Sequence, residues 1–428
     1  MKKNLFLIVS VLMLIILLPF LAGAESPVKK GERLDLQRCI ETALKNHPVL
    51  QAARDTVRIG ESRIGQARAN YYPQVNWQTD YSRLRPATSR IVEQQTYNDY
   101  SSNVTLSQTL YDFGKTKTQV NIQKLNTDSS RQDLNNVETE IVFGVKQTYY
   151  TLVQAEKNLE VAVETVNQFQ HHLDQAKGFF EVGTKPKFDV TKAEVDLSNA
   201  ILNRIRAENA LRIARVNLNN AMGIPDAPEF AIDDTLLQQQ YSADLRSALE
   251  KSYAGRPDLQ SAMKQVEAAD QSINLAHKGY YPYLTGNAGY GFRGEDFPLS
   301  EGWSVGAMVN VPVFNGLQTR YQVEEAKANL DVVKANEQSL RQQIRLEVEQ
   351  AFSNLKEAEE RTVAAQVAVR QAEENVELAN GRYAAGVGNP IEVTDALVSL
   401  SNARTTHIAA LTDARIARAG LEKAMGVK

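Results

Sequence analysis

The feature that most constrains the fold is a long helical run that occurs twice, over residues 114–183 and again over residues 317–386, at a constant offset of 203. Small or apolar residues recur in both copies at alternating steps of three and four, the heptad pattern of a helix packed along its whole length. These residues are Ile141, Val145, Thr148, Leu152, Ala155, Leu159, Ala162, Val166, Phe169, Leu173, Ala176 and Phe180, with counterparts from Ile344 and Val348 to Tyr383. At ~1.5 Å per residue, a run of about 70 residues is about 100 Å long. The sequence therefore predicts a rod.

The rest of the plan is duplicated as well. A helix before each long run ends in Tyr-Tyr-Pro, at residues 71–73 and 280–282, and a helix after each run ends in Ala-Met-Gly, at residues 221–223 and 424–426. Between the Tyr-Tyr-Pro sequence and the long run, apolar and polar residues alternate with a period of two, which predicts a pair of strands.

These signals define two structural repeats joined by a linker. The first repeat spans residues 25–225, with strands at about 74–83 and 101–111, a long helix at about 114–182 and a return helix at about 189–222. The linker spans residues 226–242. The second repeat spans residues 243–428, with strands at about 283–293 and 302–314, a long helix at about 317–385 and a return helix at about 392–425. We expect the two shorter helices of each repeat to stack end to end beside the long one.

The N-terminus has the pattern of a secretory signal. Lys2 and Lys3 precede an apolar run over residues 5–18, and residues 22–24 read Ala-Gly-Ala, so residues 1–24 are predicted to be a cleaved signal peptide. No cysteine follows the predicted cut directly, so no lipid anchor is expected there. The lone Cys39 allows no intrachain disulfide. A net charge of −3 gives no electrostatic case for nucleic acid.

The four predicted strands decide what kind of protein this is. Each has one apolar face, and aromatic residues near the strand ends are typical of outer-membrane strands. Those aromatic residues are Trp77, Tyr81, Tyr290, Phe292 and Trp303. Because roughly eight strands are needed to close a barrel, several copies must share one, two copies giving eight strands and three giving twelve. The alternative is a soluble sheet whose apolar face packs on the helices.

No enzyme, cofactor or metal site is predicted. Residues 112–114 spell the kinase tripeptide Asp-Phe-Gly, but the counterpart of Asp112 is Asn315, in the sequence Phe-Asn-Gly at residues 314–316, and no other kinase motif accompanies it. The five histidines show no metal-ligand spacing, and solvated helix faces are the default expectation for them. They are His47, His171, His172, His277 and His407. His407 stands at a seam position that is Arg204 in the first repeat, which suggests a polar seam there.

Acidic residues gather just after the turns at the far end of the long helices. Asp189 and Glu392 begin the two return helices, and Asp395 lies one turn beyond Glu392. The helix dipole is sufficient to explain Asp189. For Glu392 and Asp395 two interpretations stay open, helix capping and a ring of acids around a shared axis that selects or holds cations.

In this order, the motifs resemble those of the TolC-type outer-membrane efflux proteins over essentially the whole mature chain. The resemblance depends on the duplicated plan, the Tyr-Tyr-Pro sequences, the Phe-Asn-Gly turn, and residues 382–386, which read Arg-Tyr-Ala-Ala-Gly and lead to Glu392 and Val393. It implies a mainly α-helical fold with a small β part. As a trimer, such a chain forms a 12-stranded outer-membrane β-barrel, in contact with outer-membrane lipid and continued by an α-helical barrel in the periplasm.

The resemblance also implies a function: an outer-membrane channel of a tripartite efflux or type I secretion system. The implied partners are a periplasmic adaptor, also called a membrane fusion protein, and an inner-membrane pump of the RND or ABC type. The adaptor would dock on the tip residues Val182, Gly183, Thr184, Gly386, Val387 and Gly388. The main alternative is a periplasmic coiled-coil adaptor or scaffold without a membrane barrel. The cargo and the identity of the pump are not indicated by the sequence.

In the family, polar links between neighbouring hairpins draw the resting tip shut. The positions that match this periplasmic aperture are Asp189, Tyr383, Glu392 and Asp395. Gly388 stands where some members of the family carry an arginine, so the closing link of this chain is expected to be weaker or built differently.

Overall fold

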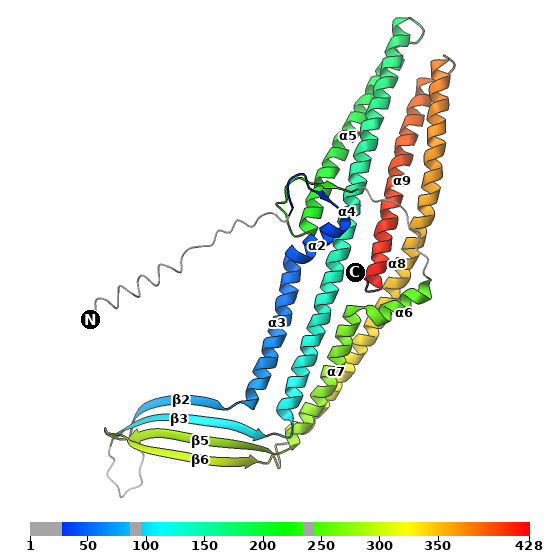
Figure 1. Ribbon diagram of the computed structural model, residues 1–428. Coiled ribbons are helices and arrows are strands. Elements are labelled where there is room, and N and C mark those ends of the chain that lie inside the picture. The colour runs from blue at the N-terminus through cyan, green and yellow to red at the C-terminus, as the bar shows by residue number, and fades with distance from the viewer. Residues whose placement is uncertain (1–27, 86–95, 234–243) are drawn as a thin grey trace, which may run out of the picture.

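The computed structural model describes residues 28–85, 96–233 and 244–428. The predicted signal peptide, and residues 234–242 of the predicted linker, lie outside the described residues. Each repeat contains, in the same order, two shorter helices, two strands, a long helix and a return helix (Figure 1).

The elements of the first repeat are α2 (Leu36–Asn46), α3 (Pro48–Arg68), β2 (Gln74–Leu84), β3 (Tyr97–Tyr111), α4 (Lys115–Glu181) and α5 (Lys187–Ala221). Those of the second are α6 (Leu245–Gly255), α7 (Pro257–His277), β5 (Tyr283–Gly294), β6 (Ser300–Asn310), α8 (Gln318–Ala384) and α9 (Pro390–Ala424). Single 3₁₀ turns, Ala69–Tyr71 and Lys278–Tyr280, lead into β2 and β5.

Two strand boundaries differ from the sequence-based expectation. β6 ends at Asn310 although a strand was expected to about residue 314, because Pro312 has no N–H to give to a strand ladder. β3 begins at Tyr97, ahead of residue 101, since Leu84 at the end of β2 still pairs with Tyr97.

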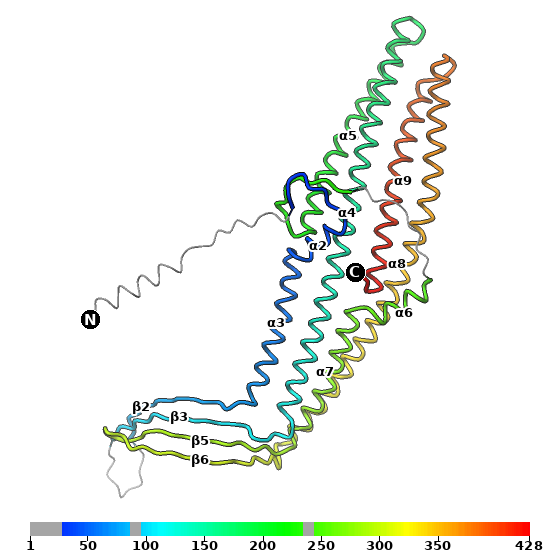
Figure 2. Tube along the Cα trace, in the orientation of Figure 1, coloured from blue at the N-terminus to red at the C-terminus, as the bar shows by residue number. Residues whose placement is uncertain are grey.

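The long helix α4 lies at the centre of the helical part. Helices α3 and α5 follow one another along one side of it, α7 and α9 along the other, and α8 packs beyond α7 and α9 (Figure 2). Most of the heptad seam is buried, including Val145 and Leu173 in α4 and Val348 and Ala372 in α8. Phe180 is 44% exposed, because the seam runs out at the tip of its hairpin. Within the described ranges, no helix combines the length and the apolar content that crossing a bilayer requires.

A compact collar lies against one side of α4 at its middle. Helix α2 packs there, together with a two-stranded parallel pair that was not anticipated, β1 (Arg33–Leu34) with β4 (Ala231–Ile232). Tyr149 is fully buried in this collar, and its hydroxyl donates a hydrogen bond to the carbonyl of Asp233 at 2.7 Å. The described part of the predicted linker is therefore attached to α4.

The four longer strands form one antiparallel sheet in the order β2-β3-β5-β6. In its register Trp77 lies opposite Val104, Val104 opposite Tyr290, and Tyr290 opposite Trp303. No described part of the chain covers this aromatic and aliphatic face, since Trp77 is 75% and Trp303 77% exposed, and the sheet projects away from the helices (Figure 1). The alternative in which the apolar face packs on the helices of the same chain is therefore wrong.

A glycine after each return helix packs closely against the joint between the two shorter helices of the same repeat. Gly223 and Gly426 follow α5 and α9 with φ angles of +72° and +74°. A Cβ added at Gly223 would lie 2.8 Å from the Cα of His47, at the α2–α3 joint, and one at Gly426 would lie 2.9 Å from the Cα of Arg256, at the α6–α7 joint.

We expect Gly223→Ala and Gly426→Ala each to lower the free energy of unfolding by more than about 1 kcal/mol, because alanine is strained at positive φ and meets backbone in both joints. Urea unfolding followed by circular dichroism measures the effect. Gly144→Ala is the control, since nothing lies within 4 Å of a Cβ there and alanine in a helix interior stabilises. Unchanged stability of both joint variants would contradict the close packing.

Candidate functional site at the hairpin tips

The α4–α5 and α8–α9 hairpins end side by side at the end of the molecule that is farthest from the sheet (Figure 1). Each turn contains a glycine with left-handed backbone, Gly183 at φ 77° and Gly386 at φ 76°, and the amide of each bonds back to the end of the long helix. These glycines let a long helix reverse direction within a few residues.

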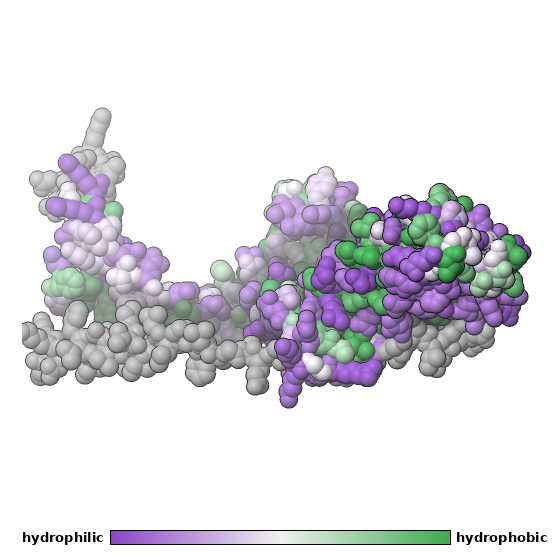
Figure 3. Space-filling model, turned by 90° about the horizontal axis from the view of Figure 1, so that it is seen from above, coloured by the Kyte–Doolittle hydropathy of each residue, from purple (hydrophilic) through white to green (hydrophobic). Residues whose placement is uncertain are grey.

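The residues predicted to dock a partner differ in accessibility. Val182, Gly183, Thr184, Gly386 and Val387 are exposed. Figure 3, which looks down on the molecule from this end, shows hydrophobic patches set among hydrophilic residues. Gly388 is buried, and its amide donates a hydrogen bond to the carbonyl of Arg382 at 2.9 Å. A Cβ at this position would lie 2.7 Å from the backbone nitrogen of Tyr383, so the turn has no room for a side chain.

The four predicted aperture residues fall into two groups. Asp189 and Tyr383 are buried, with 4% and 0% of their surface exposed, whereas Glu392 and Asp395 are exposed. Glu392 forms an ion pair with Arg382 at 3.3 Å. Within one protomer the structure thus places one pair inside the hairpin contact and the other pair on the surface.

Tyr383 is the centre of the buried group. Its ring contacts the rings of His172 and Phe179 at centroid distances of 5.2 and 5.5 Å, and the Nζ atom of Lys185 lies 5.4 Å from its ring centroid. The hydroxyl is buried, and no residue that the structure describes forms a hydrogen bond with it. Burial, and then the nearby carboxylate of Asp189, raise the pKa of Tyr383.

Three residues of this contact were not predicted from the sequence: His172, Phe179 and Lys185. His172 was expected on a solvated face, but only 2% of its surface is exposed. Phe179 immediately precedes Phe180, the predicted heptad residue. Phe179, and not the exposed Phe180, contacts Tyr383 of the second hairpin. Spacing alone carried no signal for Lys185, which belongs to the turn.

Lys185 links the two hairpins directly. Its Nζ atom donates a hydrogen bond to the carbonyl of Gly388 at 3.3 Å. The two residues occupy equivalent positions in the two repeats, since they are separated by the repeat offset of 203. At this contact the glycine contributes its backbone carbonyl, and a lysine of the other hairpin reaches it.

Further polar contacts join the hairpins below the tips. Thr394 donates a hydrogen bond to Asp196 at 2.9 Å, and Lys192 contacts the same carboxylate at 2.5 Å. Arg404 of α9 pairs with Glu164 of α4 at 2.6 Å and with Glu373 of α8 at 2.9 Å. The tips are thus held together by a short series of polar links.

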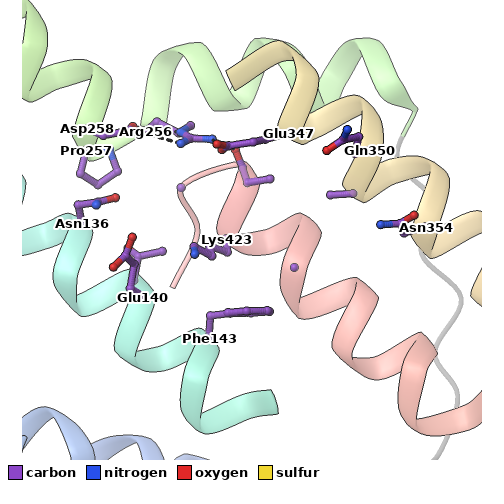
Figure 4. A pocket seen from close by; sticks show the side chains of 15 residues that line it. Asn136, Glu140, Phe143, Arg256, Pro257, Asp258, Glu347, Gln350, Asn354 and Lys423 are labelled. Atoms are coloured by element: carbon purple, nitrogen blue, oxygen red, sulfur yellow. Dashed lines mark hydrogen bonds and ion pairs between the residues drawn. The ribbon is translucent and has the colours of Figure 1, made fainter. Parts of the chain in front are cut away.

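A cavity of about 440 Å³ lies far from the tips, between α4, α7, α8 and α9 (Figure 4). Arg256 contacts Asp258 at 2.6 Å and Glu347 at 2.5 Å across it, and Lys423 lies 5.2 Å from the ring centroid of Phe143. The contact between Lys423 and Phe143 joins the second repeat to the first, whereas both partners of Arg256 lie in the second repeat. Among the described residues, no group of three or more His, Cys, Asp and Glu side chains is placed to hold a metal ion.

Solved structures share this architecture. The structure of CusC superposes with a TM-score of 0.80 at 19% sequence identity, covering 96% of this chain and 100% of that chain. At this level of identity the similarity establishes the fold.

Comparison of sequences extends the similarity. Probable efflux pump outer membrane protein TtgC of Pseudomonas putida is 25% identical over 407 residues, which cover 91% of this chain and 82% of TtgC. Protein CyaE of Bordetella pertussis is 25% identical over 389 residues, which cover 89% of this chain and 82% of CyaE. The family model described as Outer membrane efflux protein matches residues 39–224 and 248–427. This chain therefore belongs to the outer membrane efflux protein family.

Proposed function

We propose that three copies of this chain form an outer-membrane channel, which serves as the passive exit duct of a tripartite efflux or type I secretion system. The observation that carries the proposal is the uncovered apolar face of the four-stranded sheet, at one end of a helical shaft about 100 Å long. Strands cannot present unpaired edges to lipid. Three copies would pool twelve strands into one closed wall in contact with outer-membrane lipid.

Exposed apolar residues on the outermost helices support side-by-side packing of copies. They lie on one face of each helix at spacings that fit a heptad repeat. On α5 they are Val195, Leu202, Ile205, Ile213 and Val216, and on α8 they are Val332, Leu346, Val363, Val367 and Leu378. Because α5 and α8 lie at opposite edges of the protomer, α8 of one copy would pack against α5 of the next.

The polar face of the sheet supports an open interior. Opposite one another on β5 and β6 lie Gly289 and Ser304, and next along the strands Gly291 and Gly302. Such small residues leave the strand end of the duct wide. The constriction would then be the ring of helical tips, the proposed aperture. Glu392 and Asp395 are exposed and would line it, whereas Asp189 and Tyr383 are buried and would hold the two hairpins of each protomer together there.

The exposed tip turns at Val182–Thr184 and at Gly386 and Val387 would receive a periplasmic adaptor. An inner-membrane pump, of the RND or ABC type, would supply the energy and select the cargo. Docking of an adaptor at the tips is supported by their small and apolar residues, which are exposed to a partner protein.

The first prediction separates the duct from the alternative of a periplasmic scaffold without a barrel. We expect the mature protein in the outer-membrane fraction as an SDS-resistant oligomer, whose mobility on gels changes on heating because a closed barrel resists the detergent. Cell fractionation followed by gels of heated and unheated samples measures this. A protein recovered from the soluble periplasmic fraction as a heat-insensitive monomer would contradict the duct.

The second prediction concerns Lys185. The change Lys185→Met removes the hydrogen bond to Gly388 and the contact with the Tyr383 ring. The closed mouth should then lose about 1 kcal/mol of stability relative to the open mouth, which raises the ratio of open to closed mouths about fivefold. Single-channel recording in planar bilayers should show a higher resting conductance. Lys187→Met is the control, because Lys187 is exposed and two residues away. Equal resting conductance of the two variants would show that Lys185 does not help to close the mouth.

The third prediction distinguishes a ring of acids from helix capping at Glu392 and Asp395. If these carboxylates face a shared axis, the double change Glu392→Ala and Asp395→Ala should weaken block of single-channel current by divalent cations several-fold. Changing Asp174 and Glu181 to alanine alters two exposed acids of the other hairpin and is the control. Unchanged block in the first variant would leave capping as the explanation.

A further inference from the structure

We propose that protonation of His172 releases the tip of the second hairpin from the first, so that the proposed aperture loosens as the pH falls. This inference rests on the proposed function, since it names a regulation of the same mouth. It also depends on a residue that sequence reasoning had placed on a solvated helix face.

His172 is held in a site that suits a neutral imidazole. It lies on α4 with 2% of its surface exposed, and its Nδ1 atom is buried without a hydrogen-bond partner among the described residues. The fully buried Tyr383 lies next to it, 5.2 Å away between ring centroids, and its hydroxyl has no partner in the described part of the chain either. An imidazolium must donate from both ring nitrogens, whereas a neutral imidazole can leave one nitrogen unprotonated. The packed tips therefore exclude the charged form.

The charged and titratable neighbours of His172 come from each adjoining element. Helix α5 contributes Asp189, Lys192 and Asp196, and α4 itself contributes His171. Helix α8 contributes Tyr383, and Lys185 of the turn lies over that tyrosine ring. From α9, uncharged Thr394 bonds to Asp196, while Glu392 and Asp395 are exposed.

The nearby carboxylates of Asp196 and Asp189 do not stabilise a protonated His172 enough to offset its burial. Asp196, the acid with the strongest effect on His172, is already engaged by the ammonium of Lys192 at 2.5 Å and by the hydroxyl of Thr394 at 2.9 Å. Burial lowers the pKa of His172 below its usual 6.5, and this effect outweighs the opposing attraction of Asp196 and Asp189.

The direction of the pH effect follows from this depressed pKa. Above pH 6.5 the histidine is neutral in both the packed and the released tip, so the packing is fully stable. Below that pH the imidazole of His172 binds a proton in the released tip but stays neutral in the packed tip, where its pKa is lower. Each further pH unit then raises the ratio of released to packed tips by up to about tenfold, for as long as the packed form stays neutral.

Protonation of His172 would weaken the remaining contacts between the tips by displacing the ring of Tyr383. This one ring contacts His172, Phe179 and Lys185 of the first hairpin, and it directly follows Arg382, whose carbonyl anchors the turn at Gly388. Displacing the ring removes the apolar contact between the hairpins. It also leaves the hydrogen bond from Lys185 to Gly388 unsupported.

The test measures the distance between the two tip turns in the full-length trimer. Spin labels on Thr184→Cys and Val387→Cys, both exposed, report on it, and the native Cys39 is buried with a pKa raised to about 12. Between pH 7.5 and pH 5.5 we expect pulsed electron paramagnetic resonance to show a longer-distance population that grows about tenfold relative to the packed one. Single-channel conductance should rise over the same range.

Variants assign the effect to His172. In His172→Gln, which cannot titrate, the pH dependence should disappear, and in His172→Lys the long distance should already dominate at pH 7.5. His171→Gln removes an exposed histidine next to it, and His407→Gln removes another histidine whose pKa burial lowers, so both should keep the wild-type response. A pH response unchanged in His172→Gln, or absent from the wild type, would overturn the proposal. Normal channels at pH 7.5 with no pH response would leave the proposed duct intact and refute only the histidine.

Discussion

Packing along α4 is the interaction on which the rest of the protomer depends. Helices α3 and α5 use one side of it, and α7 and α9 use the other, so a single helix joins the two repeats over its whole length. Alanine and other small residues in the seam let these helices approach closely. At mid-height Lys146 of α4 pairs with Glu422 of α9 at 2.7 Å and so joins the two repeats. The collar at Tyr149 holds the linker on α4, and the ion pairs of Arg256 join α6, α7 and α8 within the second repeat. A shaft of this length is thereby held together without a globular core.

The same rigidity separates the two ends of the molecule. At one end the sheet carries Trp77 and Trp303 on a face that no part of the described chain covers. At the other end two hairpin tips meet through a few side chains. An apolar face and open strand edges are stable only against lipid and further strands. The uncovered face and the open strand edges support the proposed trimer, in which each protomer would be one segment of a larger wall.

Duplication of the sequence has not produced duplicate tips. Phe180 and Tyr383 occupy equivalent positions, yet the first is 44% exposed and the second is fully buried between the hairpins. Lys185 and Gly388 are also equivalent, and one binds the carbonyl of the other. The two repeats thus meet through different residues at matching positions. This asymmetry gives the tip a buried tyrosine and histidine on which a gate can act.

The sequence by itself determined the duplicated order of helices and strands, the length of the rods and the two faces of each strand. Heptad and period-two patterns are local properties, and they survive in the structure with shifts of a few residues. Tertiary structure alone decided that His172 is buried, that Lys185 reaches Gly388, and that β1 pairs with β4. These contacts join residues far apart in the chain or on opposing hairpins. The first two depend on how the hairpins are placed side by side, which packing on α4 fixes. The third depends on how the linker folds back on the middle of α4. No periodicity of the sequence predicts either arrangement.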